Sequence, residues 1–506
     1  MQYLLTDEQI KQVDEWTIHH VGIPAMVLME RAAMAVCSRV IDRITKKDRI
    51  LVLSGMGNNG ADGIAVARIL KESGYKVSLW PIGNREKATP EWTEQYKIAQ
   101  VLDVNIINNV AVNEYTVIVD ALFGVGLQRE ITGEYKDVID KVNASNALVF
   151  SIDVPSGVDA ARGRVHGVAI KAHITVTFGY QKLGLVLYPG TEFAGKVIVE
   201  DIGFPKKAVD VIKPDTFSYN ISDLENLPVR KNRSNKGTYG KVLIIAGSRN
   251  MAGACFLSAK AAYRMGAGLI KILTVEENRE IIQGMLPEAI LTTYQPALLK
   301  NKIEVDRIIN EIAWATTIVI GPGMGVNQSS EHLLQIVLRE AKIPVVVDAD
   351  AINLLAGWQS DTIDLPDNII LTPHLKEMAG LLHCSTETVK ENLYDIAKSA
   401  TKERGFVLAL KDARTLVTNG VKVYVNQSGN HGMATGGSGD VLTGIIAAMA
   451  AAGLSPFEAA CLGVYIHGVA GDEARKVRGT YSMMASDIVE ALSKIEHLME
   501  EGLINE

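Results

Sequence analysis

Short apolar runs alternate with helical stretches along most of this 506-residue sequence. The runs at 49–54, 76–80, 116–120 and 147–153 are mainly apolar, as in strands whose two faces are both covered. Helical patterns lie between most of these runs. The alternation predicts a parallel sheet with helices on both of its faces.

The alternation fades between residues 205 and 237, where Lys, Asp, Asn, Ser and Pro are frequent. It restarts with a second set of candidate strands, at 241–246, 318–320, 344–348, 368–372 and 406–411. A chain of this length exceeds what a single hydrophobic core holds. We therefore predict two α/β domains, a Rossmann-like three-layer α/β/α sandwich over residues 1–215 and a second α/β domain over residues 216–506.

The composition is that of an ordinary globular protein, with 47% hydrophobic and 22% charged residues. A net charge of -7 argues against a nucleic-acid binder. The four cysteines lie far apart, which favours reduced thiols in the cytoplasm. The first residues lack the pattern of a signal peptide. The longest apolar run, residues 441–454, is too short to span a bilayer and predicts a buried helix, so we expect no membrane partner.

Two glycine-rich loops stand out, one near each end of the chain. Residues 55–63 read GMGNNGADG, and residues 429–440 read GNHGMATGGSGD. Each loop opens a predicted helix, so each offers unpaired backbone N–H groups and the positive end of a helix dipole to an anion. The pair predicts two separate sites for phosphorylated ligands.

The first loop formally matches the dinucleotide-binding fingerprint, which by itself is a weak signal. A hydride-transferring enzyme should also carry an acidic residue at the end of the second strand, and residues 76–82 contain none. Oxygen atoms of Asn58, Asn59 and Asp62 suit a cation or a polar ligand edge. Dehydrogenase function is therefore disfavoured.

Two later strands end in carboxylates, Asp120 and Asp153. Taken alone, each aspartate would more often cap a turn. The carboxyl ends of parallel strands are also where ligands bind in open α/β sheets. Together with the loop at 55–63, the two aspartates favour a site at this edge of the sheet.

The motifs at 57–63, 120–124 and 153–159 resemble those of the NAD(P)H-hydrate epimerase domain. The resemblance implies a potassium site formed by Asn59, Asp120 and Ser156. It also implies that the hydrated nicotinamide nucleotide is bound by Asn58, Asn59, Gly60, Ala61, Asp62, Gly124, Val125, Gly126, Leu127, Gln128, Arg129, Glu130 and Asp153. Asp153 is a plausible acid/base for epimerisation at C6. Ala61 is a mild departure, because the family usually has Gly there.

In the second loop, residues 436–439 form a run of backbone N–H groups that can hold a phosphoryl group. Asp440 follows directly. A carboxylate repels phosphate, so Asp440 makes sense as a base beside a reacting hydroxyl. It is equally a residue that the helix dipole favours at a helix N-terminus, and both roles are compatible.

This loop and aspartate resemble the ribokinase-like superfamily, and the motifs at 321–325, 348–353, 372–374 and 429–440 narrow the resemblance to the NAD(P)H-hydrate dehydratase domain. The resemblance implies hydrate contacts from Ala254, Gly325, His374 and Asp440. It implies adenine-nucleotide contacts from Lys411, Asp412, Ala413, Arg414, Thr415 and Gly439, with ADP as phosphoryl donor and Mg²⁺ alongside. Lys376 and Asp412 stand where the family usually has Gly. His374 alone would more often be a capping or core histidine.

The two resemblances together predict a bifunctional repair enzyme. It would interconvert the R and S forms of NADH and NADPH hydrates (NADHX and NADPHX) and dehydrate the S form with ADP, releasing AMP and phosphate. We expect a homo-oligomer without nucleic-acid partners. The alternatives are a ribokinase-like small-molecule kinase fused to a nucleotide-binding domain, and a nucleotide sensor without activity.

Overall fold

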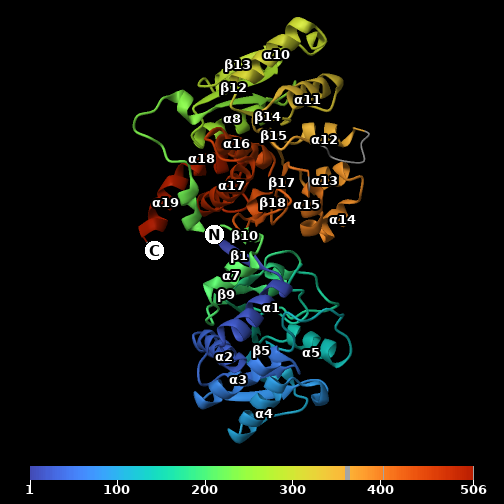
Figure 1. The fold of residues 1–506 in the computed structure, drawn as a ribbon, viewed down its shortest axis with the longest axis vertical. Coiled ribbons are helices and arrows are strands. Elements are labelled where there is room, and N and C mark those ends of the chain that lie inside the picture. Colours follow the sequence, from blue (N-terminus) through green and yellow to red (C-terminus); the bar gives the residue numbers. More distant parts are fainter. Residues whose placement is uncertain (359–364, 403, 505–506) are drawn as a thin grey trace. The chain divides into compact units, whose positions relative to one another are not determined.

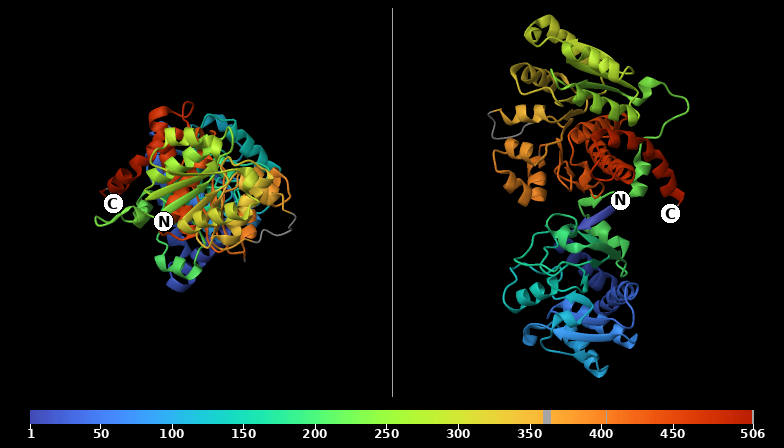
Figure 2. Two further views of the ribbon diagram at one scale, coloured as in Figure 1. Left: turned by 90° about the horizontal axis from the view of Figure 1, so that it is seen from above. Right: turned by 180° about the vertical axis from the view of Figure 1, so that it is seen from behind.

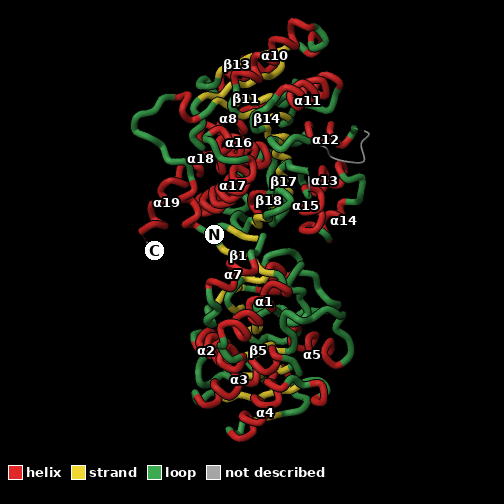
Figure 3. The backbone as a smooth tube through the Cα atoms, viewed as in Figure 1, coloured by secondary structure: helices red, strands yellow, loops and turns green. Residues whose placement is uncertain are grey.

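The computed structural model describes residues 1–358, 365–402 and 404–504, and these fold into two compact α/β units (Figure 1). The first unit comprises Gln2–Pro214, and the second begins at Asp215. Helices and strands alternate along both, with loops at the strand ends (Figure 3). The predicted α/β class is confirmed.

The first unit is built on a parallel sheet with the strand order β4-β3-β2-β5-β6-β7-β9. A separate short parallel pair joins β1 to β8. The elements are β1 (Gln2–Leu5), α1 (Asp7–Trp16), α2 (Ala25–Ile41), β2 (Arg49–Ser54), α3 (Asn58–Glu72), β3 (Lys76–Pro81), α4 (Pro90–Val101), β4 (Asn105–Ile106), β5 (Val117–Ala121), α5 (Glu134–Asn143), β6 (Leu148–Ile152), β7 (Ile174–Phe178), β8 (Gln181–Lys182), α6 (Gly190–Ala194), β9 (Lys196–Glu200) and α7 (Lys206–Ile212).

Side chains alternate along β2 between two hydrophobic cores. Ile50 and Val52 belong to the core that contains residues of α2, α3 and α4. Leu51 and Leu53 belong to the core that contains residues of α5. Because successive side chains of a strand point to opposite faces, the sheet is covered on both sides and forms the middle of three layers.

The strand order of the first unit reverses between β2 and β5. From β2 the chain moves outward to β3 and β4, and then returns to the other side of β2 with β5. Such a reversal opens a crevice at the carboxyl ends of the two central strands, where α/β proteins bind ligands. The loop at 55–63 follows β2, and Asp120 lies in β5. Both predicted ligand elements therefore flank this crevice.

The second unit has the sheet order β13-β12-β11-β14-β15-β16-β17-β18-β19-β10, parallel except where β18 runs antiparallel to its two neighbours. The order reverses again, between β11 and β14. The elements are β10 (Thr216–Ser218), β11 (Lys241–Ile245), α8 (Ala252–Arg264), β12 (Leu269–Val275), α9 (Arg279–Met285), β13 (Ile290–Tyr294), α10 (Lys302–Trp314), β14 (Thr317–Ile320), α11 (Gln328–Glu340), β15 (Val345–Val347), α12 (Asp350–Ala356), β16 (Ile369–Leu371), α13 (Leu375–Leu381), α14 (Thr386–Glu391), α15 (Leu393–Thr401), β17 (Val407–Leu410), β18 (Leu416–Thr418), β19 (Val423–Val425), α16 (Ser438–Ala451), α17 (Pro456–Arg478), α18 (Ala485–Ala491) and α19 (Ile495–Ile504).

Helices line both sides of this second sheet. Helices α8, α16 and α17 pack together and against the strands, while α10 to α15 form a second row (Figures 1 and 2). Helix α16 contains the long apolar run of the sequence and is buried along most of its length, as predicted. No helix among the described residues is long and apolar enough to cross a membrane.

Helices α16 and α8 approach each other very closely at Gly444. A Cβ atom added to Gly444 would lie 2.1 Å from the carbonyl oxygen of Ser258. No side chain fits there unless a backbone moves. The contact fixes the start of α16, and with it the second glycine-rich loop, relative to α8.

Candidate functional sites

The loop at 55–63 is held in place by contacts that only glycine allows. A Cβ atom on Gly55 would lie 1.9 Å from the carbonyl oxygen of Leu122, and one on Gly60 would lie 1.9 Å from the carbonyl oxygen of Gly55. The Ser54 hydroxyl lies 3.0 Å from the carbonyl oxygens of both Gly55 and Gly60, and the Trp92 indole N–H donates to the same hydroxyl at 3.0 Å. The first turn of α3, residues 58–62, is therefore fixed against the end of β5.

Asp120 is a fully buried carboxylate surrounded by neutral donors. The Ser156 hydroxyl donates to it at 2.6 Å, the Ser156 backbone N–H at 2.9 Å and the Ser151 hydroxyl at 2.8 Å. Burial raises the pKa of Asp120, and these hydrogen bonds oppose the rise. In the described structure no lysine, arginine or histidine forms an ion pair with this carboxylate. A buried carboxylate without a counter-charge is a place that favours a bound cation.

The residues next to Asp120 fit such a cation. A Cβ atom on Gly124 would lie within 3.2–3.4 Å of the side-chain atoms of Asn59, so Asn59 sits against the loop that follows β5. The Asn59 amide nitrogen is buried without a hydrogen-bond partner. Since Asn59, Asp120 and Ser156 all carry side-chain oxygens, and oxygen ligands suit hard cations, the donor set matches the predicted potassium site.

Asp153 lines a pocket whose volume is about 710 Å³, including the part that is open to solvent. Its polar lining includes Asn58, Asp62 and Asp153, and Val125 also lines it. Its apolar lining comprises Ile10, Leu28, Met29, Ala32, Phe178, Ile202 and Phe204. A largely apolar lining with a few polar groups is the usual form of a small-molecule site.

The rest of the predicted hydrate-binding loop lies further out. Val125 alone of residues 124–130 lines the pocket, while Gly126 and residues 128–130 are exposed. Ala61, by contrast, is fully buried in the hydrophobic core, so its methyl group packs internally. Four charged residues that line the pocket were not predicted from the sequence: Lys11 and Asp14 from α1, Glu91 from α4 and Lys182 from β8.

In the second unit, four neighbouring strands deliver the predicted site residues to one edge of the sheet. Gly325 follows β14, Asp348 follows β15, His374 follows β16 and Lys411 follows β17. Because the four strands are parallel, their carboxyl ends meet at this edge. The order of the strands in the sheet therefore explains why motifs far apart in sequence come together.

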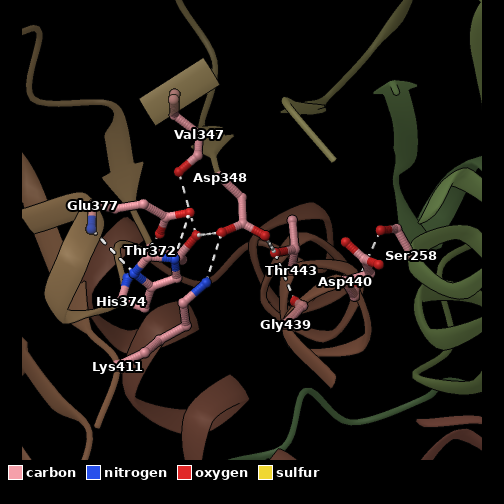
Figure 4. A network of polar contacts seen from close by, with 10 residues as sticks. All are labelled: Ser258, Val347, Asp348, Thr372, His374, Glu377, Lys411, Gly439, Asp440 and Thr443. Carbon is pink, nitrogen blue, oxygen red and sulfur yellow. Dashed lines mark hydrogen bonds and ion pairs between the residues drawn. The ribbon is translucent and has the colours of Figure 1, made fainter. Parts of the chain in front are cut away.

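Asp348 is the centre of a buried polar network (Figure 4). Its carboxylate lies 2.9 Å from the Lys411 ammonium and accepts hydrogen bonds from the Thr372 and Thr443 hydroxyls, each at 2.7 Å. Burial works against ionisation, but Lys411 and the two hydroxyls hold the pKa of Asp348 below its ordinary value. For Lys411, burial is likewise overcome by Asp348 and Glu377, and its pKa is raised. Both charges persist at neutral pH.

Asp440 lies in the first turn of α16, one helical turn before Thr443. Burial raises the pKa of Asp440 to about 7, and the Asp348 carboxylate acts in the same direction. A Cβ atom on Gly439 would lie 3.4 Å from the Lys411 Nζ, whereas one on Gly436 would meet nothing within 4 Å. The loop thus has an ammonium close to Gly439 and open space at Gly436, an arrangement that suits an incoming phosphoryl group.

Asp472 of α17 holds the beginning of the second loop. Its carboxylate accepts hydrogen bonds from the Gly429 N–H at 2.8 Å and the Asn430 amide at 2.9 Å. The partly buried His467 side chain lies 3.3 Å from the Ser438 hydroxyl, and desolvation lowers the pKa of His467 to about 4. The Asp472 carboxylate and the neutral His467 imidazole therefore both contact the loop.

His374 caps α13 and is also half exposed at the site edge. Its Nδ1 accepts the Glu377 N–H at 3.1 Å, and the Glu377 carboxylate accepts the His374 N–H at 2.8 Å. Burial and the Lys411 charge lower the pKa of His374, so the ring is neutral at pH 7. The capping role is established here, and the exposed ring is free to meet a ligand as well.

The remaining predicted residues surround this network. Ala254 of α8 is buried against the loop after β14, where a Cβ atom on Gly323 would lie 3.0 Å from its own Cβ. The Gly325 N–H donates to Asp350 at 2.8 Å. Lys376 is exposed on the first turn of α13, and Asp412 is partly exposed after β17. Among the described residues no group of three or more His, Cys, Asp or Glu side chains is arranged to hold a metal ion.

Family models match both units of the chain. Residues 242–494 match the model described as NAD(P)H-hydrate dehydratase, and residues 25–184 match the model described as YjeF-related protein N-terminus. The first match contains all the predicted dehydratase residues, and the second contains all the predicted epimerase residues.

Curated relatives match over nearly the whole chain. The bifunctional NAD(P)H-hydrate repair enzyme of Moorella thermoacetica is 36% identical over 99% of this chain and 97% of its own length. The enzyme of the same name from Escherichia coli is 35% identical, covering 94% of this chain and 90% of its own. The crystal structure of a ribokinase-like superfamily protein from Enterococcus faecalis matches with a TM-score of 0.50 and 27% identity, over 56% of this chain and 96% of that one.

The buried Asp348–Lys411 pair generates a stability prediction. Asp348→Asn leaves the Lys411 ammonium buried without its carboxylate, and this should lower the free energy of unfolding of the second unit by about 3–5 kcal/mol. The double variant Asp348→Asn/Lys411→Met should recover most of the loss, because no unpaired charge remains. Urea unfolding followed by circular dichroism measures both.

Glu340→Gln is the matched control, since it breaks the exposed Arg339–Glu340 ion pair. It should cost less than about 1 kcal/mol. Equal losses for Asp348→Asn and Glu340→Gln would show that the buried pair does not stabilise the second unit.

Proposed function

The chain belongs to the family of bifunctional NAD(P)H-hydrate repair enzymes, and from this premise we propose how its two units divide the work. The first unit is the epimerase and interconverts the R and S forms of the hydrated nicotinamide nucleotide. The second unit is the dehydratase and returns the S form to NADH or NADPH at the expense of ADP. The observation that carries the proposal is the pairing, in one chain, of a carboxylate-lined pocket with a glycine-rich phosphoryl site whose aspartate has a pKa near 7.

Dehydration needs a better leaving group than hydroxide at neutral pH. Transfer of the β-phosphoryl group of ADP to the C6 oxygen of the hydrate, with release of AMP, supplies one. Loss of phosphate from C6 and of a proton from C5 then restores the C5–C6 double bond. The products are the reduced nicotinamide, AMP and phosphate.

Asp440 is the base of the first step. It takes the proton of the C6 hydroxyl as the oxygen attacks phosphorus, which a carboxylate with a pKa of about 7 does well at neutral pH. The backbone N–H groups of residues 436–439 stabilise the charge on the transferring group. Ala254, Gly325 and His374 surround the hydrate, and residues 411–415 with Gly439 hold the nucleotide.

Magnesium enters this site with the nucleotide. Mg²⁺ keeps several waters and binds through phosphates with one or two carboxylates, so it needs no cage of protein ligands. When bound, the ion neutralises phosphate charge.

In the first unit, Asp153 exchanges a proton with the substrate near C6, which lets the hydroxyl-bearing carbon invert. The pocket at Asp153 is lined by apolar side chains that suit a nicotinamide ring and by polar groups that suit its hydroxyl. Asn59, Asp120 and Ser156 hold a potassium ion, which supplies the positive charge that the buried Asp120 lacks.

A cytoplasmic location and a homo-oligomeric state complete the proposal. The location is supported by the cysteines, none of which forms a disulfide and three of which (Cys37, Cys255 and Cys461) are buried as thiols. The homo-oligomeric state stays a prediction.

Repair is tested by supplying mixed NADHX epimers with ADP, Mg²⁺ and K⁺ and following the return of reduced-nicotinamide absorbance. We expect a fast phase from the S form and a slower phase, limited by epimerisation, from the R form. Asp440→Ala should slow the fast phase by roughly 10²–10⁴-fold, as loss of a general base does. Asp306→Ala, which removes an exposed carboxylate on α10, should leave both phases unchanged. If no absorbance returns with either ADP or ATP, the proposed function is wrong.

The pKa of Asp440 fixes the direction of the pH dependence. Below pH 7 the raised pKa keeps the carboxyl protonated and unable to accept a proton. The dehydratase kcat/KM should therefore rise about tenfold per pH unit up to about pH 6 and level off above about pH 8. Initial rates with the S epimer across this range measure the profile. A rate that falls as pH rises from 5.5 to 8 would remove Asp440 from the role of base.

The potassium site is tested by thermal unfolding, independently of activity. Replacing choline chloride by KCl at equal ionic strength should raise the melting temperature of the first unit, by about 2–4 °C for each kcal/mol of binding free energy. Asp120→Asn should abolish this response. Asp137→Asn, at an exposed position on α5, should retain it. A potassium response that survives in Asp120→Asn would place the ion elsewhere.

A further inference from the structure

Lys182 is a fully buried lysine whose three N–H donors all have partners. Its ammonium lies 2.5 Å from the Asp153 carboxylate and donates to the Thr177 hydroxyl at 2.9 Å and to the Phe178 carbonyl at 3.0 Å. The Thr177 hydroxyl in turn donates to Asp153 at 3.0 Å. Lys182 and Thr177 therefore grip the same carboxylate oxygen of Asp153.

The backbone places Lys182 there by a dedicated strand pair. Residues 181–182 form β8, which pairs in parallel with β1, and Lys182 lies opposite Leu5. The chain turns back directly from β7, so Thr177 and Phe178 reach the ammonium from only four or five residues away. The strand pair positions the backbone of Lys182, and the contacts with Asp153, Thr177 and Phe178 hold its ammonium.

Several carboxylates line the same pocket as the Lys182 ammonium. The charged groups that line the pocket are Lys11 and Asp14 from α1, Asp62 from α3, Glu91 from α4, Asp153 and Lys182. Burial raises the pKa of Asp62 well above its ordinary value, and the charges of Asp153 and Asp14 act in the same direction. Burial and Asp153 also raise the pKa of Asp14, which Lys182 opposes. Lys182 is thus a fully buried cation in a pocket lined by several carboxylates.

Asp153 has a strained backbone. Its φ is +65°, in the left-handed region that a residue other than glycine adopts at a cost of about 1–2 kcal/mol. Strain of this kind persists only where the surroundings enforce it, and it gathers at functional sites. The Asp153 side chain is 14% exposed, at the pocket, while Lys182 beneath it is 1% exposed. Lys182 therefore contacts the Asp153 carboxylate from the protein interior, and the exposed part of the carboxylate lies at the pocket.

A buried ion pair is a poor way to stabilise a fold, because apolar residues of similar volume usually stabilise it as well or better. The position therefore calls for a reason other than packing. We propose that Lys182 is a positioning residue of the epimerase reaction, holding the Asp153 carboxylate in the orientation from which it exchanges a proton with the substrate. The inference rests on the proposed epimerase function of the first unit.

The proton exchange balances on Asp153 alone. Asp153 takes the proton of the C6 hydroxyl while the C6–N1 bond breaks and a C6 carbonyl forms, and N1 receives that proton from Asp153. After the carbonyl presents its other face, N1 attacks C6, Asp153 takes back the N1 proton, and the new hydroxyl receives it. No net proton is gained or lost, and Lys182 keeps its three protons throughout.

The test uses the full chain and the two-phase assay with mixed NADHX epimers. Lys182→Met keeps an unbranched side chain, one atom shorter, and removes its charge. It should lower the epimerase kcat by about 100-fold and change KM by less than about threefold, because the lysine acts through Asp153 and is itself only 1% exposed. The fast phase, which reports the dehydratase, should be unchanged. Lys182→Arg should recover part of kcat, since it restores the charge but not the compact ammonium.

A double-mutant cycle separates positioning from general stability. If Lys182 acts through Asp153, the variant Asp153→Asn/Lys182→Met should be no slower than Asp153→Asn alone. This double variant leaves no unpaired charge, so it stays folded even if Lys182→Met does not. Lys136→Met, which breaks an exposed ion pair with Asp140, is the matched control and should keep the wild-type kcat.

The outcomes are distinct. A wild-type chain without any slow phase above the spontaneous rate refutes the epimerase function itself. A wild-type slow phase with an unchanged kcat in Lys182→Met overturns the inference about Lys182. So does a double variant that is slower than Asp153→Asn by the full factor of Lys182→Met, because additive losses mean that the lysine acts independently of Asp153.

Discussion

A buried aspartate at the carboxyl end of a parallel strand organises the site in each unit. Asp120 draws two serine hydroxyls to itself, and Asp348 draws two threonine hydroxyls. The difference is the counter-charge, because Asp348 has the Lys411 ammonium and Asp120 has no cationic side chain among the described residues. A buried carboxylate that stays ionised is stabilised by such a charge. The proposed potassium ion would balance the charge of Asp120 in the first unit, as Lys411 balances the charge of Asp348 in the second.

The two carboxylates that we propose exchange protons lie beside these buried aspartates. Asp440 lies one turn from Thr443 and close to the Asp348 charge, and its pKa rises to about 7 through burial first and that charge second. Asp153 is instead gripped by Lys182 and Thr177. One fold type thus supports two acid–base sites of different character, since the neighbours of each carboxylate decide how readily it holds a proton.

The sequence predicts best what depends on local pattern. The strands at 49–54 and 241–245 are continuous apolar runs and form where expected. The strands at 174–178 and 290–294 were not predicted, because threonines interrupt their apolar character. The glycine-rich loops carry their own signal, since a Cβ atom added to Gly55 or Gly60 would collide with backbone, while Gly436 borders open space. Lys182 carries none, because nothing near it in sequence shows that Asp153, 29 positions earlier, would lie beside its ammonium.

Because the two compact units belong to one polypeptide, they are always made in equal amounts. Water adds to reduced nicotinamide on either face, so damage arrives as a mixture of epimers that a stereospecific dehydratase alone would leave half repaired. A single translated chain delivers one epimerase for every dehydratase, whatever the level of expression. A change in gene dosage then alters both activities together, and the ratio of the two steps depends on the two turnover rates alone.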